Sequence, residues 1–584
     1  MNVLSELRRR FAAALAEVTA DAGLSPGEIA ELANQVHPSQ DAKFGDYQAN
    51  CAMPLGKRLG RNPRDVAAQL RAKLSLGDLS LPPEIAGPGF INLRLADDWL
   101  TALLQAEVDD PRLGVEPVAK PRTYVIDYSG PNVAKPMHVG HIRSTVIGDC
   151  LYRTLKFLGH RVIGDNHLGD WGTQFGMIIH GFRHFRDEAA YRQRPVDELA
   201  RLYKLVHRQV DQADVASAVL AETAKLHAGD PENLRLWREF MPPCLAAIEE
   251  VYGRLGVRFD HTLGESFYHD RLGDVVGDLR RRGIARESDG AVCVFFDDSP
   301  VPMIVRKRDG AYLYATSDLA TIQYRMETWR PDAILYVVDK RQSDHFKLLF
   351  AAARKWGYEN VEFEHVSFGT VLGEDGKPFK TRSGDTVGLM GLLDEAVARA
   401  YDVVCEIDGK NPDGPEIDEA QRRQIAEVVG LSAIKYADLS QNRTSDYVFS
   451  HDKMIALRGN TATYMQYAYA RVRSVFRKGN IDVEGLRAAH PAIRLDAPAE
   501  RALGLSLLRF SEAIELTVAD YRPNQLTTYL FDLANAYSTF YEQCPVLKAD
   551  APAVRDSRLL LCDLTARTLK QGLALLGIDV VEKM

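Results

Sequence analysis

Residues 127–141 of the chain read DYSGPNVAKPMHVGH. The apolar run TYVID at 123–127 has the composition of a buried strand, and the pattern over 138–158 is helical. Ligands of open parallel sheets bind just beyond the carboxyl ends of the strands, and a helix N-terminus offers unpaired N–H groups and partial positive charge to phosphate. This succession of strand, turn and helix therefore predicts a phosphate-binding edge of a parallel sheet.

Two histidines stand at the beginning of the expected helix. His138 and His141 are three residues apart and share one helical face. Gly140 between them leaves room for a nucleotide close to the backbone. An isolated pair of this kind is more often packed or exposed, and occasionally binds a metal, so the catalytic interpretation depends on the residues around it.

Further strands and helices alternate along the middle of the chain. The runs RVIGD at 161–165 and AILYVVD at 333–339 are strand-like, and helical patterns separate the strands. This alternation predicts an α/β fold with a Rossmann-like, doubly wound parallel sheet. We expect an N-terminal α+β domain before it and a C-terminal all-α bundle after it. The predicted boundaries are 1–118 for the N-terminal domain, 119–400 for the sheet domain with a helical insertion at about 186–300, 401–450 for a helical connector, and 451–584 for the bundle.

Composition excludes several classes of protein. The 584 residues carry a net charge of -8, and no apolar run approaches the roughly 18 residues that a membrane span needs. The N-terminus lacks the apolar segment of a signal peptide. The seven cysteines contain no CxxC pair, which disfavours a disulfide framework and a four-cysteine zinc site. We expect a cytoplasmic protein without a membrane partner or a metal site. The negative net charge does not exclude a nucleic-acid partner, because an acidic chain of this size can still carry a basic face.

The segment 127–141 resembles a known signature. Its HVGH resembles the HIGH motif of class I aminoacyl-tRNA synthetases, and the longer string resembles the arginyl-tRNA synthetase form of that motif. The second signature of the class, KMSKS, resembles GKPFKTRSG at 376–384. Lys380 matches the first lysine of KMSKS, whereas Ser383 stands where the second lysine would be. Taken alone, 376–384 would be interpreted as a solvated basic loop.

The resemblance assigns roles to individual residues. A transferring phosphate needs positive charge where negative charge develops, and Lys135 or Arg382 could replace the missing lysine. The residues implied for ATP binding are His138, Gly140, His141, Lys380 and Arg382, and those implied for catalysis are Lys135, His138, His141 and Lys380. Residues 166–176, NHLGDWGTQFG, also resemble a family segment, which we expect to line the pocket.

Arginine recognition needs planar carboxylates, because these accept the guanidinium N–H donors in pairs. The resemblance maps recognition of the guanidinium onto Asp127, Tyr314 and Asp318, and of the amino and carboxyl ends onto Asn132, His138 and Gln342. Tyr314 and Asp318 are four residues apart and would share a helical face. Without the resemblance, Asp127 would be a turn residue, Tyr314 a packed aromatic and Asp318 a helix cap.

The flanking domains resemble the RNA-binding parts of the family. Aromatic residues and arginines interleave over 456–473, and bases of RNA loops stack on such side chains, as in a helical anticodon-binding domain. Tyr464, Tyr467 and Phe540 could equally belong to the core of the bundle. The N-terminal block, with FGDYQ at 44–48, resembles the extra domain that contacts the elbow of the transfer RNA.

The resemblance covers nearly the whole chain. It implies an arginine–tRNA ligase that activates L-arginine with ATP and transfers it to the terminal adenosine of tRNA(Arg), releasing AMP and pyrophosphate. Mg²⁺ would accompany ATP without a dedicated protein site, and we expect a monomer. Two alternatives stay open: a class I synthetase for another amino acid or a small-molecule adenylyltransferase, and a non-catalytic RNA-binding paralogue.

Overall fold

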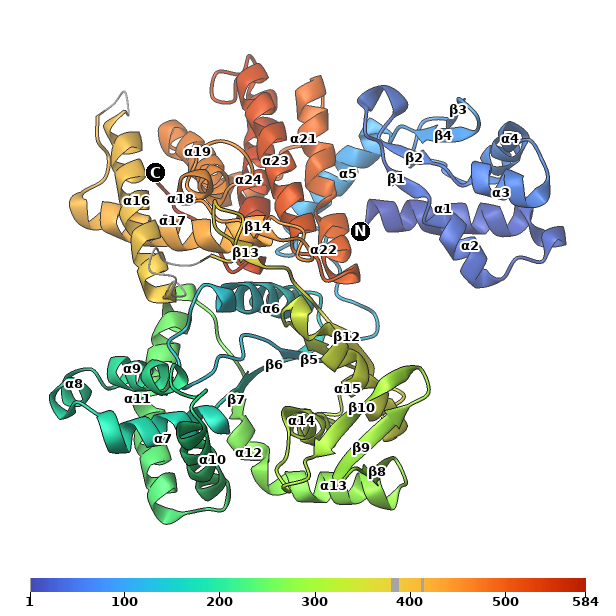
Figure 1. Ribbon diagram of the computed structural model, residues 1–584. Coiled ribbons are helices and arrows are strands. Elements are labelled where there is room, and N and C mark those ends of the chain that lie inside the picture. Colours follow the sequence, from blue (N-terminus) through green and yellow to red (C-terminus); the bar gives the residue numbers. More distant parts are fainter. Residues whose placement is uncertain (1, 380–387, 411–413) are drawn as a thin grey trace.

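The computed structural model describes residues 2–379, 388–410 and 414–584. Lys380, Arg382 and Ser383 lie outside the described residues. The chain divides into an N-terminal domain, a central α/β domain and a C-terminal helical bundle (Figure 1). None of the described helices combines the length and the apolar character needed to cross a lipid bilayer.

The central sheet has five strands in the order β12-β11-β5-β6-β7, and every neighbouring pair is parallel. This arrangement confirms the predicted doubly wound sheet. Its strands are β5 (Thr123–Asp127), β6 (Arg161–Leu168), β7 (His261–Gly264), β11 (Ala333–Tyr336) and β12 (Glu362–His365).

Helices cover both faces of this sheet. Because side chains of a strand alternate between its faces, Tyr124 and Ile126 of β5 pack into the core that contains α6 (Gly140–Phe157). Val125 between them packs into a separate core with α14 (Tyr314–Thr328) and α15 (Ser343–Lys355). The turn after β5 is thereby held between two packed layers.

The expected helical insertion at about 186–300 is all-helical only as far as Leu255, and strands alternate with the helices beyond it. After it, β7 joins the edge of the central sheet, and β8, β9 and β10 form a separate antiparallel sheet. The strand β7 reads HTLG and is mostly exposed, so it lacks the apolar run that would reveal it. The elements of this region are α7 (Thr173–Phe185), α8 (Glu188–Gln193), α9 (Pro195–His207), α10 (Ala213–His227), α11 (Pro231–Leu255), α12 (Glu265–Tyr268), α13 (Leu272–Arg281), β8 (Ala285–Ser288), β9 (Ala291–Phe296) and β10 (Ser299–Arg306).

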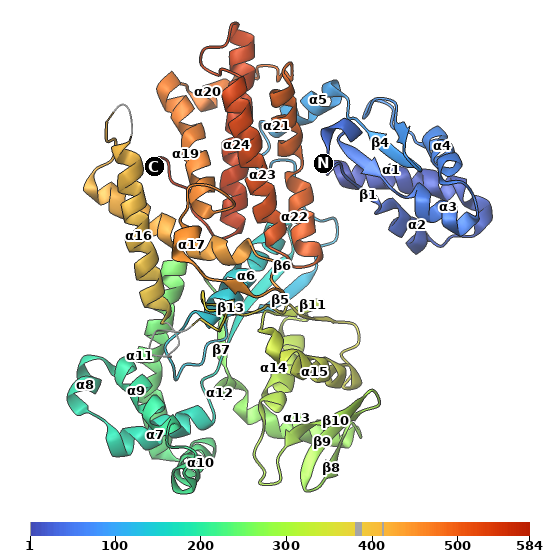
Figure 2. The same cartoon turned by 45° about the horizontal axis from the view of Figure 1, so that its top comes forward.

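The N-terminal domain packs helices against an antiparallel sheet of order β1-β2-β4-β3, which fits the α+β expectation. Its elements are α1 (Val3–Val18), α2 (Pro26–Ala33), β1 (Val36–Pro38), β2 (Tyr47–Ala49), α3 (Ala52–Leu59), α4 (Pro63–Lys73), β3 (Glu84–Ala86) and β4 (Phe90–Leu93). Helix α5 (Asp97–Glu107) then leads toward the bundle (Figure 2).

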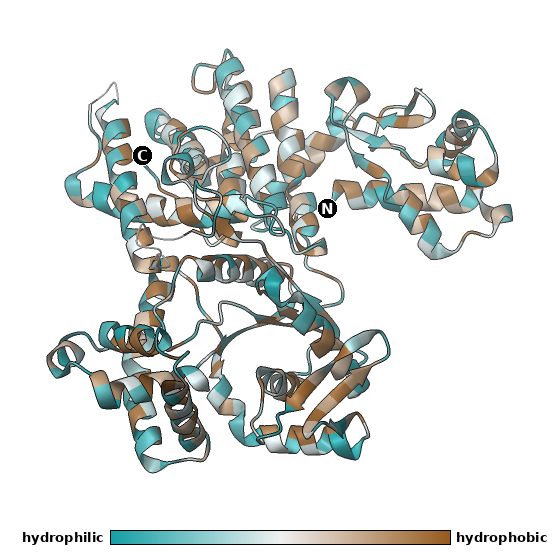
Figure 3. Cartoon of the chain, in the orientation of Figure 1, coloured by the Kyte–Doolittle hydropathy of each residue, from teal (hydrophilic) through white to brown (hydrophobic). Residues whose placement is uncertain are grey.

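The C-terminal part is helical, as predicted, and Figure 3 shows hydrophobic and hydrophilic residues alternating along its helices. Its helices are α16 (Leu389–Gly409), α17 (Glu419–Leu439), α18 (His451–Met454), α19 (Ala462–Gly479), α20 (Val483–Ala488), α21 (Pro498–Leu508), α22 (Phe510–Ala519), α23 (Asn524–Gln543) and α24 (Pro552–Leu575). The short strands β13 (Val371–Leu372) and β14 (Tyr447–Val448) pair in parallel and join this part to the sheet domain. Phe540 is fully buried and belongs to the core of the bundle, whereas Tyr464 and Tyr467 are half-buried.

Candidate functional site

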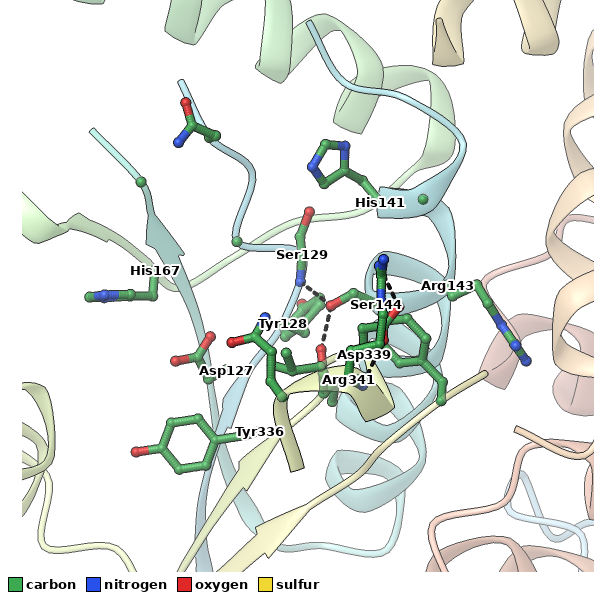
Figure 4. Close-up of a pocket in the computed structure, with 18 of the residues that line it drawn as sticks. Asp127, Tyr128, Ser129, His141, Arg143, Ser144, His167, Tyr336, Asp339 and Arg341 are labelled. Atoms are coloured by element: carbon green, nitrogen blue, oxygen red, sulfur yellow. Dashed lines mark hydrogen bonds and ion pairs between the residues drawn. The ribbon is translucent and has the colours of Figure 1, made fainter. Parts of the chain in front are cut away.

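A cavity of about 670 Å³ opens at the carboxyl edge of the central sheet (Figure 4). Its walls come from the ends of β5, β6 and β11, the beginning of α6, and the beginning of α14. The predicted residues that line it are Asp127, Asn132, His138, Gly140, His141, Tyr314, Asp318 and Gln342. The structure thus brings together side chains that are far apart in the sequence.

The turn after β5 has an unusual backbone. Ser129 has a φ of 70°, a conformation that is uncommon for a residue other than glycine and is concentrated at functional sites. The Ser129 N–H donates to Ser144 Oγ at 2.8 Å, and Ser144 Oγ donates to the Val337 carbonyl at 2.5 Å. Helix α6 and the segment after β11 therefore hold this turn on both sides (Figure 4).

The two histidines stand side by side with ring centroids 4.0 Å apart. Nδ1 of His141 accepts from the His138 N–H, and Nδ1 of His138 accepts from the Gly140 N–H, each at 3.1 Å. Accepting at Nδ1 places the proton of each neutral ring on Nε2, which is then a donor. Burial lowers the pKa of His141 to about 3, and burial, with Lys135 and Arg341 nearby, also lowers the pKa of His138. Both rings therefore act as neutral hydrogen-bond donors.

Asp127 does not stand alone at the end of β5. Its partner in the sheet register is Asp165 of β6, and the guanidinium of Arg325 lies between the two carboxylates. Nη2 of Arg325 donates to Asp127 Oδ2 at 2.6 Å and to Asp165 Oδ2 at 2.8 Å. Asp127 lines the cavity, whereas Asp165 and Arg325 are fully buried beneath it.

Asp318 and Tyr314 share the face of α14 that borders the cavity, as their spacing predicted. Asp318 Oδ2 lies 2.6 Å from Nε2 of His345 on α15, so its carboxylate already has a hydrogen-bonding partner. The ring of Tyr314 meets the edge of the same histidine, with centroids 4.8 Å apart. Tyr314 is 62% exposed, which leaves its ring open to a ligand.

Lys135 occupies a different place from the other predicted residues. Its Nζ lies 4.5 Å from the ring centroid of Tyr203 on α9, and the residue is not part of the cavity wall. Its positive charge nevertheless lowers the pKa of both histidines. Lys380 and Arg382 cannot be placed, because they fall in the segment outside the described residues.

Sequence reasoning missed several side chains of the cavity. Glu265 follows β7 directly and lines the cavity, where burial raises its pKa to about 7. Arg341, in the turn after β11, also lines the cavity and pairs with Asp339 at 2.9 Å. A position just after a parallel strand was the available signal for Glu265, but β7 was not recognised as a strand.

Arg143 links the histidine-bearing helix to the C-terminal part. It is fully buried, and its Nε lies 3.1 Å from Asp438 Oδ2 of α17. Its Nη1 donates to the Ser445 carbonyl at 3.0 Å, next to β14.

The described residues contain no group that could hold a metal ion. Across 2–379, 388–410 and 414–584, no three His, Cys, Asp or Glu side chains lie close enough together to do so.

Comparison with known proteins gives matches along the chain. Residues 103–451 match the family model described as class I (R) tRNA synthetase catalytic domain, 465–584 match a DALR anticodon-binding domain, and 5–95 match an arginyl-tRNA synthetase N-terminal domain. An arginine–tRNA ligase of Rhodopirellula baltica is 48% identical, with 100% of both chains covered, and one of Erwinia tasmaniensis is 46% identical over 98% of this chain and 99% of its own length.

Solved structures agree with these sequence matches. The arginyl-tRNA synthetase of Plasmodium falciparum superposes with a TM-score of 0.83 and 28% identity, covering 100% of this chain and 99% of its own. The enzyme of Thermus thermophilus superposes with a TM-score of 0.80 and 25% identity, covering 99% of this chain and 100% of its own. The likeness therefore includes all three parts of the molecule.

Proposed function

The chain belongs to the arginyl-tRNA synthetase family, and from that premise we propose that it is an arginine–tRNA ligase. It joins L-arginine to the terminal adenosine of tRNA(Arg) at the expense of ATP, which leaves as AMP and pyrophosphate. The observation that carries this proposal is the shared cavity of Asp127, Asp318 and the two histidines. Carboxylates suited to a planar cation thus lie beside donors suited to a phosphate.

The substrate amino acid lies along the cavity with its guanidinium between Asp127 and Asp318 and beneath the Tyr314 ring. Asn132 and Gln342, which line the same cavity, hold its amino and carboxyl ends together with His138. A site built on buried polar pairs discriminates against analogues that leave those pairs unsatisfied, by about 10⁴-fold or more. The citrulline isostere leaves the carboxylates uncompensated, so an editing domain is unnecessary.

In the first step the arginine carboxylate attacks the α-phosphorus of ATP, and the bond to pyrophosphate breaks. The Nε2–H groups of His138 and His141 and the N-terminus of α6 donate to the phosphate oxygens as negative charge concentrates there. Lys135 and Lys380 contribute positive charge, and Arg382 and Gly140 belong to the ATP subsite. Mg²⁺ would accompany ATP and would offset negative charge on its phosphates. A ribose hydroxyl of the terminal adenosine then attacks the mixed anhydride, and AMP leaves.

The flanking domains supply the transfer RNA contacts. The bundle comprises residues 451–584 and follows a connector at 401–450. It binds the anticodon, and the domain at 1–118 contacts the elbow of the L-shaped transfer RNA. The family matches to the DALR and N-terminal domains support this division. The enzyme works as a monomer in the cytoplasm, with the sheet domain at 119–400 as its catalytic part.

Charging of bulk transfer RNA with each labelled amino acid tests this function. We expect arginine alone to be esterified, and esterification of a different amino acid, or of none, would overturn the proposal. Replacing Asp318 by Asn should raise the arginine KM by roughly tenfold or more, since a charged partner is removed from a buried site, while the ATP KM stays within about twofold. An unchanged arginine KM would remove Asp318 from the guanidinium subsite.

A further inference from the structure

A guanidinium of the protein itself lies buried behind the wall of the cavity that we propose binds arginine. Arg325 of α14 has a fully buried side chain, and its Nε and Nη2 donate to Asp165 Oδ2 at 3.0 and 2.8 Å. Nη2 also donates to Asp127 Oδ2 at 2.6 Å, and the guanidinium carbon lies 5.4 Å from the ring centroid of Tyr336. The protein thus surrounds one of its own arginines with carboxylates and an aromatic ring.

Arg325 does not occupy the place of the substrate. Asp127 and Tyr336 line the cavity (Figure 4). Arg325 and Asp165 are not part of its wall, and their side chains have no exposed surface. Asp127 and Tyr336 therefore lie between the cavity on one side and the buried pair of Arg325 and Asp165 on the other. From this position the guanidinium holds Asp127 from behind and leaves the cavity side of the carboxylate to a ligand.

The charges of this cluster decide what the cavity can bind. Two carboxylates and one guanidinium sum to a single negative charge, which Asp127 contributes to a cavity that Asp318 also lines. Without the guanidinium, Asp127 at the end of β5 and its register partner Asp165 within β6 would face each other, and one of them would retain a proton. Burial already raises the pKa of Asp127, and Arg325 is the largest influence that opposes this rise. A protonated Asp127 would offer a hydroxyl to the substrate in place of an anionic acceptor.

We propose that Arg325 is a specificity-determining positioning residue, which fixes Asp127 as an oriented anion and thereby makes the cavity select a cationic side chain over its neutral isostere. The inference deepens the proposed function and rests on it. Arg325 acts through Asp127 and touches no substrate. Loss of its charge therefore affects discrimination between arginine and citrulline, and not only the binding of both.

The test compares Arg325→Met with the wild-type enzyme in the presence of transfer RNA. The readouts are the arginine KM, the ATP KM and the inhibition constant of citrulline as a competitor of arginine. We expect the arginine KM to rise roughly 30-fold or more, as when one partner of a buried charge pair is truncated. The ATP KM should stay within about twofold, and the ratio of the citrulline constant to the arginine KM should fall by about tenfold. An unchanged ratio would overturn the proposal, because a merely structural defect weakens the binding of arginine and of citrulline to the same extent.

A charge-balanced variant separates electrostatics from packing. In Arg325→Met with Asp165→Asn, the remaining Asp127 again carries the single negative charge, so part of the lost discrimination should return relative to Arg325→Met alone. Additive losses in this double variant would overturn the proposal. If Arg325→Met does not fold, Arg325→Gln decides, because glutamine removes the positive charge but keeps side-chain N–H donors for the carboxylates. The preference for arginine over citrulline should then fall, and an unchanged preference would overturn the proposal.

Arg271→Met is the matched control. Arg271 forms a partly exposed ion pair at 2.9 Å with Glu327, which lies in the last turn of α14, and Arg271 does not border the cavity. The kinetic constants of Arg271→Met should equal those of the wild-type enzyme. Failure of the wild-type enzyme to charge arginine would reject the proposed function itself, whereas wild-type charging with an unchanged preference in Arg325→Met would reject only this inference.

Discussion

At the scale of single residues, the cavity works through groups whose protonation the fold has changed. His141 is neutral at ordinary pH because burial lowers its pKa to about 3. A neutral ring that accepts from a backbone N–H must donate through its other nitrogen. We therefore expect His141 to contribute a directed hydrogen bond to a phosphate oxygen rather than a positive charge.

Replacing His141 by Ala should lower the rate of the activation step by roughly 100-fold or more, which is typical for loss of one preorganised donor to a developing anion. The arginine KM should change far less, because we assign the ring to the ATP subsite and not to the guanidinium subsite. Single-turnover aminoacylation measures the step directly. A rate equal to that of the wild type would show that His141 has no part in the chemistry.

Glu265 predicts a dependence of arginine binding on pH. Burial raises its pKa to about 7, with the charges of Asp318 and Asp170 adding to the rise and His167 opposing it. The carboxylate is ionised above that pKa, and a cation binds the ionised form, so the arginine KM should fall as pH rises. Between pH 6 and 8 the fall should be roughly tenfold, in proportion to the ionised fraction.

In Glu265→Gln this pH dependence should flatten. Glu287→Gln, on an exposed edge of β8, is the matched control and should retain the wild-type profile. A KM that rises with pH in the wild type, or an unaltered profile in Glu265→Gln, would contradict the assignment.

At the scale of elements, the site depends on how closely α6 approaches β5. Gly148 faces Tyr128, and a Cβ at this position would lie 2.3 Å from Cβ and Cγ of the tyrosine. The ring of Tyr128 in turn packs on Phe259, with centroids 4.5 Å apart, next to the beginning of β7. Helix α6, which begins just after His138 and carries His141 in its first turn, is thus positioned by a glycine two turns later.

Gly148→Ala should destabilise the protein by about 1–3 kcal/mol, despite the better helix propensity of alanine, because the added methyl group overpacks the core. It should also lower kcat, since α6 and the turn after β5 must separate. Gly253→Ala is the control: nothing lies within 4 Å of a Cβ at this position in α11, and it should stabilise by about 0.4–1 kcal/mol. Thermal midpoints of both variants give the comparison, and equal midpoints would refute the packing argument.

At the scale of the whole molecule, the N-terminal domain is attached to the bundle by buried polar contacts. Arg501 of α21 donates to both carboxylate oxygens of Asp46 at 2.9 and 2.8 Å and to the Leu95 carbonyl at 2.9 Å. Tyr47 donates to Glu512 of α22 at 2.5 Å. Such contacts fix orientation, because a polar group left unpaired in this interface costs more than the pair gains.

Arg501→Met should loosen this interface, since Asp46 would be left as an uncompensated buried carboxylate. If the N-terminal domain contacts the transfer RNA, the KM for transfer RNA should rise about fivefold or more while the arginine KM at saturating transfer RNA is unchanged. Limited proteolysis should cut faster in the connection after α5. Arg555→Met, which loses only an exposed ion pair with Asp556, should change neither the KM for transfer RNA nor the rate of proteolytic cleavage. Wild-type cleavage in Arg501→Met would show that these contacts do not hold the domain.

The local pattern of the site could be predicted from the amino-acid sequence alone. The strand, turn and helix of residues 123–157, the adjacent histidines and the shared face of Tyr314 and Asp318 follow from spacing along the chain, which covalent geometry translates directly into position. The parallel sheet followed from the same patterns. The roles of individual residues in arginine binding came from the family resemblance and still await the experiments above.

Which charged side chains meet depends on how the whole chain folds. Arg325 reaches Asp127 from 198 residues away and Asp165 from 160 residues away, and His345 reaches Asp318 from a neighbouring helix. Glu265 enters the cavity because the short strand β7 adds to the sheet without an apolar pattern of its own. Partnership between distant side chains depends on chain topology and on the loss of water around both groups, and neither is encoded in local spacing.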